Sequence, residues 1–202
     1  MNEKERVRKA VESYLGAEGH GVGLHDSYGV NVGANSFSDL KPETSEFILK
    51  HFNNNDTILD VGPGSGLYNI IMKDVLGFNN IDCVEVFKPH INHYKYSERY
   101  RNVYHSDIMD FKFDYYDIII MGDILEHLSI VNAQKLLQYI MKKSKCIIVQ
   151  IPYMYKQGEV YGNVYEIHKQ GDLTPKNFLE RYPYMKLLCN NKRTGVYYVI
   201  ND

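Results

Sequence analysis

Short apolar runs alternate with longer amphipathic stretches along most of the chain. Residues 116–121 and 145–151 are apolar at nearly every position, which is typical of strands buried on both faces of a parallel sheet. Between them, residues 131–143 have the length of a helix, with lysines in the last turn, where cations favour the helix dipole. Strands that alternate with helices of this length predict an open parallel sheet covered by helices on both faces.

The same pattern predicts seven strands and a hairpin at the end. The expected strands are residues 57–61, 81–86, 102–105, 116–121, 145–151, 185–189 and 196–200. The main expected helices are residues 3–15, 42–52, 66–76, 89–100 and 131–143. Six polar residues that include Gly195 join the last two strands, a connection typical of a hairpin. We therefore expect an α/β, Rossmann-like, seven-stranded sheet that is mostly parallel and has an antiparallel last strand.

Composition narrows the classes of partner. The formal net charge of −2 provides no overall field that would attract a phosphate backbone, so nucleic acid is an unlikely partner. Cys83, Cys146 and Cys189 each lie in an expected strand and form no CxxC pair, which favours a reducing compartment. The first residues are charged and lead into no apolar stretch, and no apolar run reaches about 20 residues. These features predict a cytoplasmic protein without a membrane partner.

A glycine-rich loop lies between the first expected strand and the helix that follows it. The loop reads Asp60-Val61-Gly62-Pro63-Gly64-Ser65-Gly66. Glycines let a backbone pass close to a ligand and expose N–H groups at a helix N-terminus. The strand, loop and helix together are typical of nucleotide binding, although a glycine loop alone is a weak signal.

Two acidic residues strengthen this interpretation. Glu85 ends the second expected strand, where a carboxylate can accept hydrogen bonds from both hydroxyls of a ribose. Asp107 follows the third expected strand and can accept from an adenine amino group. Each alone fits a solvated strand end or a turn former. Together, after a glycine loop and at the carboxyl ends of successive strands, they favour a nucleoside site.

With these residues in place, the chain resembles the class I S-adenosylmethionine-dependent methyltransferases from about residue 56 to its end. The segments ILDVGPGSG, CVEVF, HSDIMDF and YDIIIMGDILEHL resemble four motifs of that family in order. The resemblance implies S-adenosylmethionine as cofactor and S-adenosylhomocysteine as product. The residues that it implies for cofactor binding are Asp60, Gly62, Pro63, Gly64, Gly66, Glu85, Val86, Asp107, Ile108, Gly122 and Asp123.

The candidates for catalysis lie after the fourth and fifth expected strands. Methyl transfer to a hydroxyl needs positioning and, in some enzymes, a base that takes the proton. We take His168, Asp123 and His127 as the catalytic candidates. His168 is the first choice because it lies on the substrate side and its ordinary pKa suits a base.

Two other interpretations of this region stay open. Asp123 and Glu126 have the spacing of a capping box at the start of a helix, and His127 suits a buried brace. Alternatively, Asp123-x-x-Glu126-His127 resembles the acidic and histidine cluster of ubiquinone-pathway O-methyltransferases and of metal-using small-RNA terminal 2′-O-methyltransferases. Residues at i, i+3 and i+4 share a helix face, and His168 could complete a metal set with Glu126 and His127. Our primary interpretation assigns no metal.

The insertion before the terminal hairpin is rich in tyrosine. Tyr153, Tyr155, Tyr161 and Tyr165 suit either stacking on a flat acceptor or packing of a lid. The stretch around His168 resembles a segment of bacterial small-molecule and glycan methyltransferases. A glycine-rich leader that contains His25, Asp26 and Tyr28 could form the opposite wall.

These features predict a single methyltransferase domain and three candidate functions. Its parts would be an N-terminal helix and glycine-rich cap (1–40), a cofactor-binding core (41–150), a substrate-side insertion (151–183) and a terminal hairpin (184–202). The favoured function is O-methylation of a small molecule or of a sugar in glycan modification. The alternatives are a metal-assisted RNA 2′-O-methyltransferase and a cofactor-binding module without catalysis. A homodimer is one possible assembly.

Overall fold

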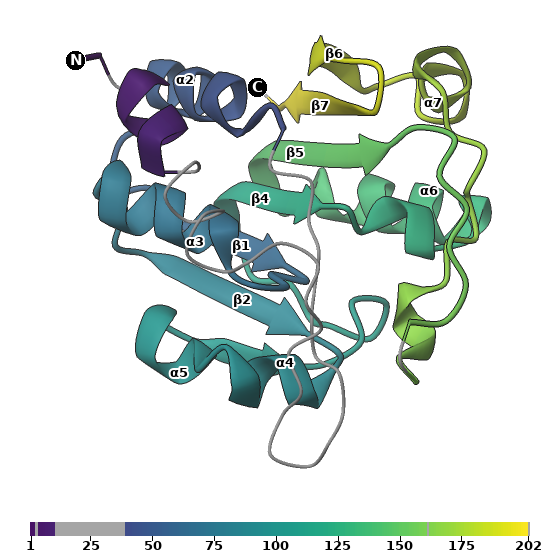
Figure 1. Ribbon diagram of the computed structural model, residues 1–202, viewed down its shortest axis with the longest axis horizontal. Helices are drawn as coiled ribbons and strands as arrows, with labels where there is room; N and C mark the ends of the chain where they lie inside the picture. Colours follow the sequence, from purple (N-terminus) through teal and green to yellow (C-terminus); the bar gives the residue numbers. More distant parts are fainter. Residues whose placement is uncertain (3, 11–38, 161, 202) are drawn as a thin grey trace.

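A twisted seven-stranded sheet organises the chain, and a computed structural model describes residues 1–2, 4–10, 39–160 and 162–201 (Figure 1). The strand order is β3-β2-β1-β4-β5-β7-β6. The strands are β1 (Ile58–Val61), β2 (Ile81–Glu85), β3 (Val103–His105), β4 (Tyr116–Gly122), β5 (Ser144–Pro152), β6 (Lys186–Asn190) and β7 (Thr194–Ile200). Strands β1 to β5 pair in parallel, and β7 pairs antiparallel with both β5 and β6. The predicted mostly parallel sheet with its antiparallel hairpin is confirmed.

Helices cover both faces of the sheet, as predicted. Residues 4–10 are helical, and the further elements are α2 (Lys41–His51), α3 (Leu67–Asn69), η1 (Ile70–Val75), α4 (Lys88–His93), α5 (Tyr96–Arg99), η2 (Leu125–His127), α6 (Ile130–Ile140), η3 (Val164–Glu166) and α7 (Pro175–Arg181). Along β4, Ile118 and Ile120 pack toward α2 and α3, whereas Ile119 and Met121 pack toward α6 and α7. The near-continuous apolar run of β4 therefore serves two cores.

The topology places a ligand site at one edge. The chain runs outward from β1 through β2 to β3, then crosses back to β4 on the other side of β1. In such sheets a crevice opens beyond the carboxyl ends of the strands at the point where the order reverses. In Figure 1 the arrows of β1, β2 and β4 all point toward this edge.

Three helix predictions differ in detail from the structure. The helix predicted over 89–100 is broken into α4 and α5 because Lys95 has a left-handed backbone, with φ 51°. The break turns Tyr96 and Tyr100 toward the glycine loop, as described below. The helix after the loop continues as η1, which has π-helical hydrogen bonds. Helix α6 ends at Ile140, so the lysines expected in its last turn follow the helix instead.

Local signals at other positions are confirmed. Pro42 lies in the first turn of α2, and Thr174 caps α7 in a capping box with Asn177. The three cysteines lie in strands and are free thiols. Among helices of the described ranges, none is both long enough and apolar enough to cross a bilayer. The predicted end of the first helix and the glycine-rich leader, with His25, Asp26 and Tyr28, lie outside the described residues.

Candidate active site

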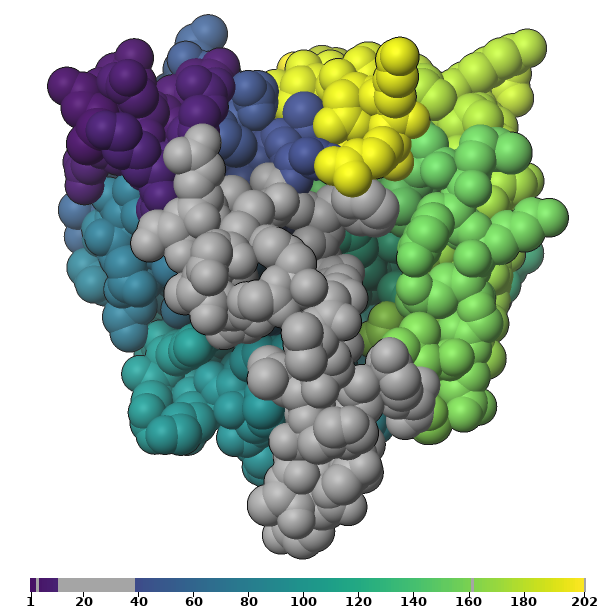
Figure 2. Space-filling model, in the orientation of Figure 1, coloured from purple at the N-terminus to yellow at the C-terminus, as the bar shows by residue number. Residues whose placement is uncertain are grey.

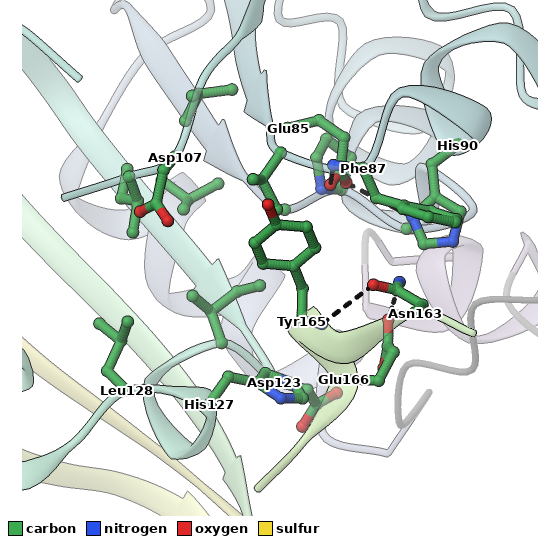
Figure 3. Close-up of a pocket in the computed structure, with 18 of the residues that line it drawn as sticks. Glu85, Phe87, His90, Asp107, Asp123, His127, Leu128, Asn163, Tyr165 and Glu166 are labelled. Atoms are coloured by element: carbon green, nitrogen blue, oxygen red, sulfur yellow. Dashed lines mark hydrogen bonds and ion pairs between the residues drawn. The ribbon is translucent and has the colours of Figure 1, made fainter. Parts of the chain in front are cut away.

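A cavity of about 430 Å³ opens at the carboxyl ends of β1, β2 and β4 (Figure 3). Most of the residues predicted to bind a cofactor line it: Gly62, Pro63, Gly64, Glu85, Val86, Asp107, Ile108, Gly122 and Asp123. Two of the predicted residues, Asp60 and Gly66, do not line it but support its wall. Of the catalytic candidates, Asp123 and His127 line this cavity and His168 does not.

The glycine loop forms the floor of the cavity in a conformation that only glycine adopts readily. Gly62 has φ 59°, and a Cβ atom there would lie 2.2 Å from Cδ1 of Ile124. Gly64 and Gly66 also have positive φ, and Gly66 precedes the first residue of α3. From outside, the Tyr96 hydroxyl donates to the Gly64 carbonyl, and Arg99 Nη1 donates to the Ser65 carbonyl at 3.0 Å. The loop is therefore held in shape before any ligand arrives.

Asp60 lies directly beneath this loop and is 2% exposed. The Tyr100 hydroxyl donates to its Oδ2 at 2.8 Å. Burial raises the pKa of Asp60 to about 6, and the Tyr100 hydrogen bond and the nearby Lys41 ammonium oppose that rise. Asp60 is thus held by Tyr100 at the end of β1 and does not line the cavity.

Lys41 is a fully buried lysine that the sequence analysis did not single out. Its Nζ donates to Oε1 of Gln150 at 2.7 Å and lies 3.8 Å from the centre of the Tyr68 ring. Burial lowers the pKa of Lys41 to about 8, while the charges of Asp123 and Asp60 oppose this. A lysine at the start of a polar helix gives no sign of burial in the sequence.

Glu85 is positioned by two neighbours on the following turn. The Phe87 backbone N–H donates to Oε1 of Glu85 at 2.7 Å, and Nδ1 of His90 lies 3.6 Å from Oε2. Both Glu85 and His90 are buried. His90 was not predicted, although a histidine one turn after a strand-end carboxylate is a detectable signal. The Glu85 carboxylate is therefore oriented at the rim of the cavity.

Asp107 both closes a turn and lines the cavity. Its Oδ1 accepts a hydrogen bond from the Met109 backbone N–H at 2.8 Å, which closes a turn. It also lines the cavity beside Ile108, across from Glu85 in Figure 3. The turn former is thus also a cavity residue.

The segment after β5 forms the wall opposite α4. In Figure 2 its green surface borders this face of the molecule, across from the teal surface of α4 and α5. Asn163 Oδ1 accepts from the Tyr165 backbone N–H at 3.1 Å, and the Tyr165 ring extends into the cavity toward Glu85 (Figure 3). Burial raises the pKa of Glu166, which lines the same wall.

The other tyrosines of the insertion differ in their surroundings. The Tyr153 hydroxyl is 2.7 Å from the Tyr197 hydroxyl and belongs to the packing of β7. Tyr155 is half exposed and its ring contacts His168. Tyr161 lies outside the described residues. Of Tyr153, Tyr155 and Tyr165, the three that the structure describes, Tyr165 is the one that lines the cavity.

The capping-box interpretation of Asp123 and Glu126 is wrong. Asp123 has a left-handed backbone, with φ 56°, and the long helix begins only at Ile130, where the Ser129 side chain is the N-cap. The Glu126 side chain points inward and is 0% exposed. Neither of its carboxylate oxygens accepts a hydrogen bond from a residue that the structure describes. Burial, with the nearby charge of Asp123, raises the pKa of Glu126 well above its usual range.

Two histidines meet at this carboxylate. His168 Nε2 lies 4.0 Å from Oε1 of Glu126, and the His127 and His168 rings are 4.7 Å apart. Nδ1 of His168 donates to the Tyr155 carbonyl at 2.8 Å, which leaves Nε2 as the acceptor nitrogen of a neutral ring. Burial lowers the pKa of both histidines, that of His127 to about 4.

These three residues fit a divalent metal. One ligand atom from each of Glu126, His127 and His168 lies within 4.8 Å of the others. A carboxylate and two neutral imidazoles are the donors that zinc, manganese or iron ions accept. The Glu126 oxygens that accept no hydrogen bond from the described residues are the observation that supports the fit, because a buried carboxylate without a partner is costly.

The fold recurs among solved structures of methyltransferases. The methyltransferase domain of bacterial CtHen1 matches with a TM-score of 0.55 and 20% identity over 78% of this chain and 95% of that one. The N-terminal domain of EvdMO1 with SAH bound matches with a TM-score of 0.60 and 14% identity over 100% and 98%. An Archaeoglobus fulgidus SAM-dependent methyltransferase matches with a TM-score of 0.56 and 15% identity over 79% and 92%.

These likenesses bear on the fold. The sheet, its strand order and its covering helices are those of the class I methyltransferase fold. No protein-family model matches the chain, and no curated protein matches its sequence.

Proposed function

We propose that this chain is an S-adenosylmethionine-dependent methyltransferase that methylates a hydroxyl of a small molecule or sugar. The observation that carries the proposal is the cavity at the reversal point of the sheet, where the glycine loop, Glu85 and Asp107 come from three successive strand ends. Its volume of about 430 Å³ lies in the range that suits a nucleoside-sized ligand with part of a second one.

Each wall of the cavity would hold one part of the cofactor. Glu85 would accept hydrogen bonds from the ribose hydroxyls, and Asp107 with Ile108 would flank the adenine. The glycine loop and Asp123 would face the methionine end. When bound, S-adenosylmethionine supplies a methyl group on a positively charged sulfur. The carboxylates that surround the cavity suit a ligand with that charge.

The acceptor side would be formed by Asp123, His127 and Tyr165. Asp123 and His127 line the cavity, so either can take a proton from an acceptor hydroxyl. The lowered pKa of His127 keeps its ring neutral near pH 7, as a base requires. His168, the first choice from the sequence, lies behind Glu126, so its role would be to position that carboxylate and His127.

Replacing Glu85 tests the cofactor assignment. Glu85→Gln keeps the shape of the side chain but removes the charge that would hold two ribose hydroxyls. We expect the dissociation constant for S-adenosylhomocysteine to rise about 10- to 100-fold, measured by isothermal titration calorimetry. Glu98→Gln on α5, outside the cavity lining, is the matched control and should bind normally. No binding by the unaltered chain would overturn the proposal.

A second candidate, metal-assisted methylation, is favoured by the cluster of Glu126, His127 and His168. A divalent ion held there would act as a Lewis acid on an acceptor hydroxyl at the edge of the cavity. The sequence resemblance to small-RNA terminal 2′-O-methyltransferases makes a ribose hydroxyl one such acceptor. Activity that survives exhaustive treatment with EDTA would exclude this candidate and leave the metal-free one.

A further inference from the structure

A second hollow lies on the other side of the insertion, next to the candidate active site. It is an open groove of about 550 Å³, and its polar lining includes Lys156, His168, Lys169, Asp172 and Arg181. Lys169 lines both this groove and the main cavity. His168 borders the groove while its Nε2 faces Glu126. The groove therefore leads to the acceptor side of the cavity.

The walls of this groove are anchored by one buried glutamine. Gln170 is 2% exposed, and its Nε2 donates to the carbonyls of Leu125 and Leu128 at 3.0 and 3.1 Å. Its Oε1 accepts from the Tyr182 hydroxyl at 2.8 Å and from Arg181 Nη1 at 3.3 Å. These bonds tie the insertion to η2 and α7, so the groove is a built feature of the fold.

The two sides of the groove approach each other closely at Gly171. A Cβ atom at this position would lie 3.0 Å from Cα of Lys156 and 3.1 Å from the Tyr155 carbonyl oxygen. This close approach brings Lys156 beside Asp172 and Arg181. Backbone packing against Gly171 thus fixes the position of the Lys156 Cα atom, although the side chain itself is flexible.

The groove carries an excess of positive charge on a chain whose net charge is −2. Its one carboxylate, Asp172, is paired with Arg181 at 2.5 Å. Within the described residues, no carboxylate lies within 4.0 Å of Nζ of Lys156 or Lys169, by contrast with Lys4 and Lys176 elsewhere. Arg181 and, to a smaller degree, Lys156 lower the pKa of Asp172, and the three cationic side chains of the groove, Lys156, Lys169 and Arg181, outnumber this one carboxylate.

We propose that this groove binds a phosphate or diphosphate group carried by the acceptor, while the acceptor hydroxyl enters the main cavity. The inference rests on the proposed function and narrows its substrate class to phosphorylated small molecules. Lysine ammonium groups beside an arginine are suited to phosphate oxygens through charge-assisted hydrogen bonds. Lys169, which borders both hollows, would align the two ends of the acceptor.

Calorimetry with uridine 5′-diphosphate as the probe tests the proposal. A pyrimidine is chosen because an adenine nucleotide could enter the cofactor site. We expect the diphosphate to bind at least about tenfold more tightly than uridine at low ionic strength, and Lys156→Gln to weaken it about five- to tenfold. Lys192→Gln, on the exposed hairpin turn, is the matched control and should leave binding unchanged.

Three outcomes would overturn the proposal. They are equal affinity for uridine and its diphosphate, equal loss in the Lys156→Gln and Lys192→Gln variants, and tighter binding of a short single-stranded RNA than of the diphosphate. A separate titration with S-adenosylhomocysteine keeps the two proposals apart. If S-adenosylhomocysteine binds but the diphosphate does not, the groove assignment fails and the cofactor assignment stands. If S-adenosylhomocysteine does not bind, the proposed function fails first.

Discussion

Glu126→Gln is expected to lower the rate of methyl transfer by about 10³-fold if the buried cluster holds a metal, since a Lewis acid contributes several kcal/mol to such a reaction. The same substitution should leave the metal-free protein at least as stable as the wild type. Glu126 is 0% exposed and accepts no hydrogen bond from the described residues, so burial imposes a free-energy cost on its ionised form and raises its pKa well above the usual range. A neutral amide of the same shape removes that cost, worth about 1–3 kcal/mol.

Three measurements check this prediction. Urea unfolding in EDTA gives the stability, methyl transfer with added Mn²⁺ gives the rate, and the thermal midpoint with and without Mn²⁺ reports metal binding. Mn²⁺ should raise the midpoint of the wild type and not that of Glu126→Gln. Glu180→Gln is the matched control because its side chain is 62% exposed on α7. Full activity of Glu126→Gln, with an unchanged response to Mn²⁺, would disprove the metal site.

Gly62→Ala is expected to weaken S-adenosylhomocysteine binding by more than about 100-fold, because either the loop or the Ile124 side chain must move and hydrogen bonds to a bound ligand tolerate only small shifts. The new Cβ would lie 2.2 Å from Cδ1 of Ile124, at φ 59°. Ile124 lines the cavity, so a shift of its side chain would change the space beside the loop. The left-handed backbone adds a loss of stability of about 1–2 kcal/mol.

Gly77→Ala separates these two effects. Gly77 has φ 80°, and a Cβ atom there would meet no atom within 4 Å. It should therefore lose a similar amount of stability in urea unfolding but keep its affinity for S-adenosylhomocysteine. If Gly62→Ala binds as well as Gly77→Ala does, the glycine loop does not contact the ligand as proposed.

The cofactor side of the site could be predicted from sequence because its signals are local. Glu85 and Asp107 each follow a strand directly, and the carboxyl ends of parallel strands meet at one edge, so residue order alone brings them together. Gly62 and its neighbours were also placed by residue order, because they follow one strand and precede one helix. The sheet was predictable because β4 and β5 are apolar at nearly every position, and the terminal hairpin because a few polar residues join its two strands.

The acceptor side could not be predicted in the same way. The position of His168 depends on its hydrogen bond to the Tyr155 carbonyl and on the hydrogen bonds of Gln170 to η2. The residues that these bonds join are far apart in the sequence and follow no helical or strand spacing. Lys41 is buried by contacts with Gln150 and Tyr68, more than 20 residues away at the nearest. The break at Lys95 was also missed, because a left-handed lysine has no signature in the sequence.

The anchoring of Gln170 also has an evolutionary consequence. Several residues of the segment after β5 line the cavity or the groove, and Gln170 ties this segment to η2 and to α7 through Leu125, Leu128 and Arg181. The glycine loop is instead supported by Tyr96, Arg99 and Tyr100 from the opposite side of the sheet edge. Under the proposed function, substitutions in this segment would alter acceptor preference and leave the supports of the glycine loop unchanged, so the two properties could evolve separately.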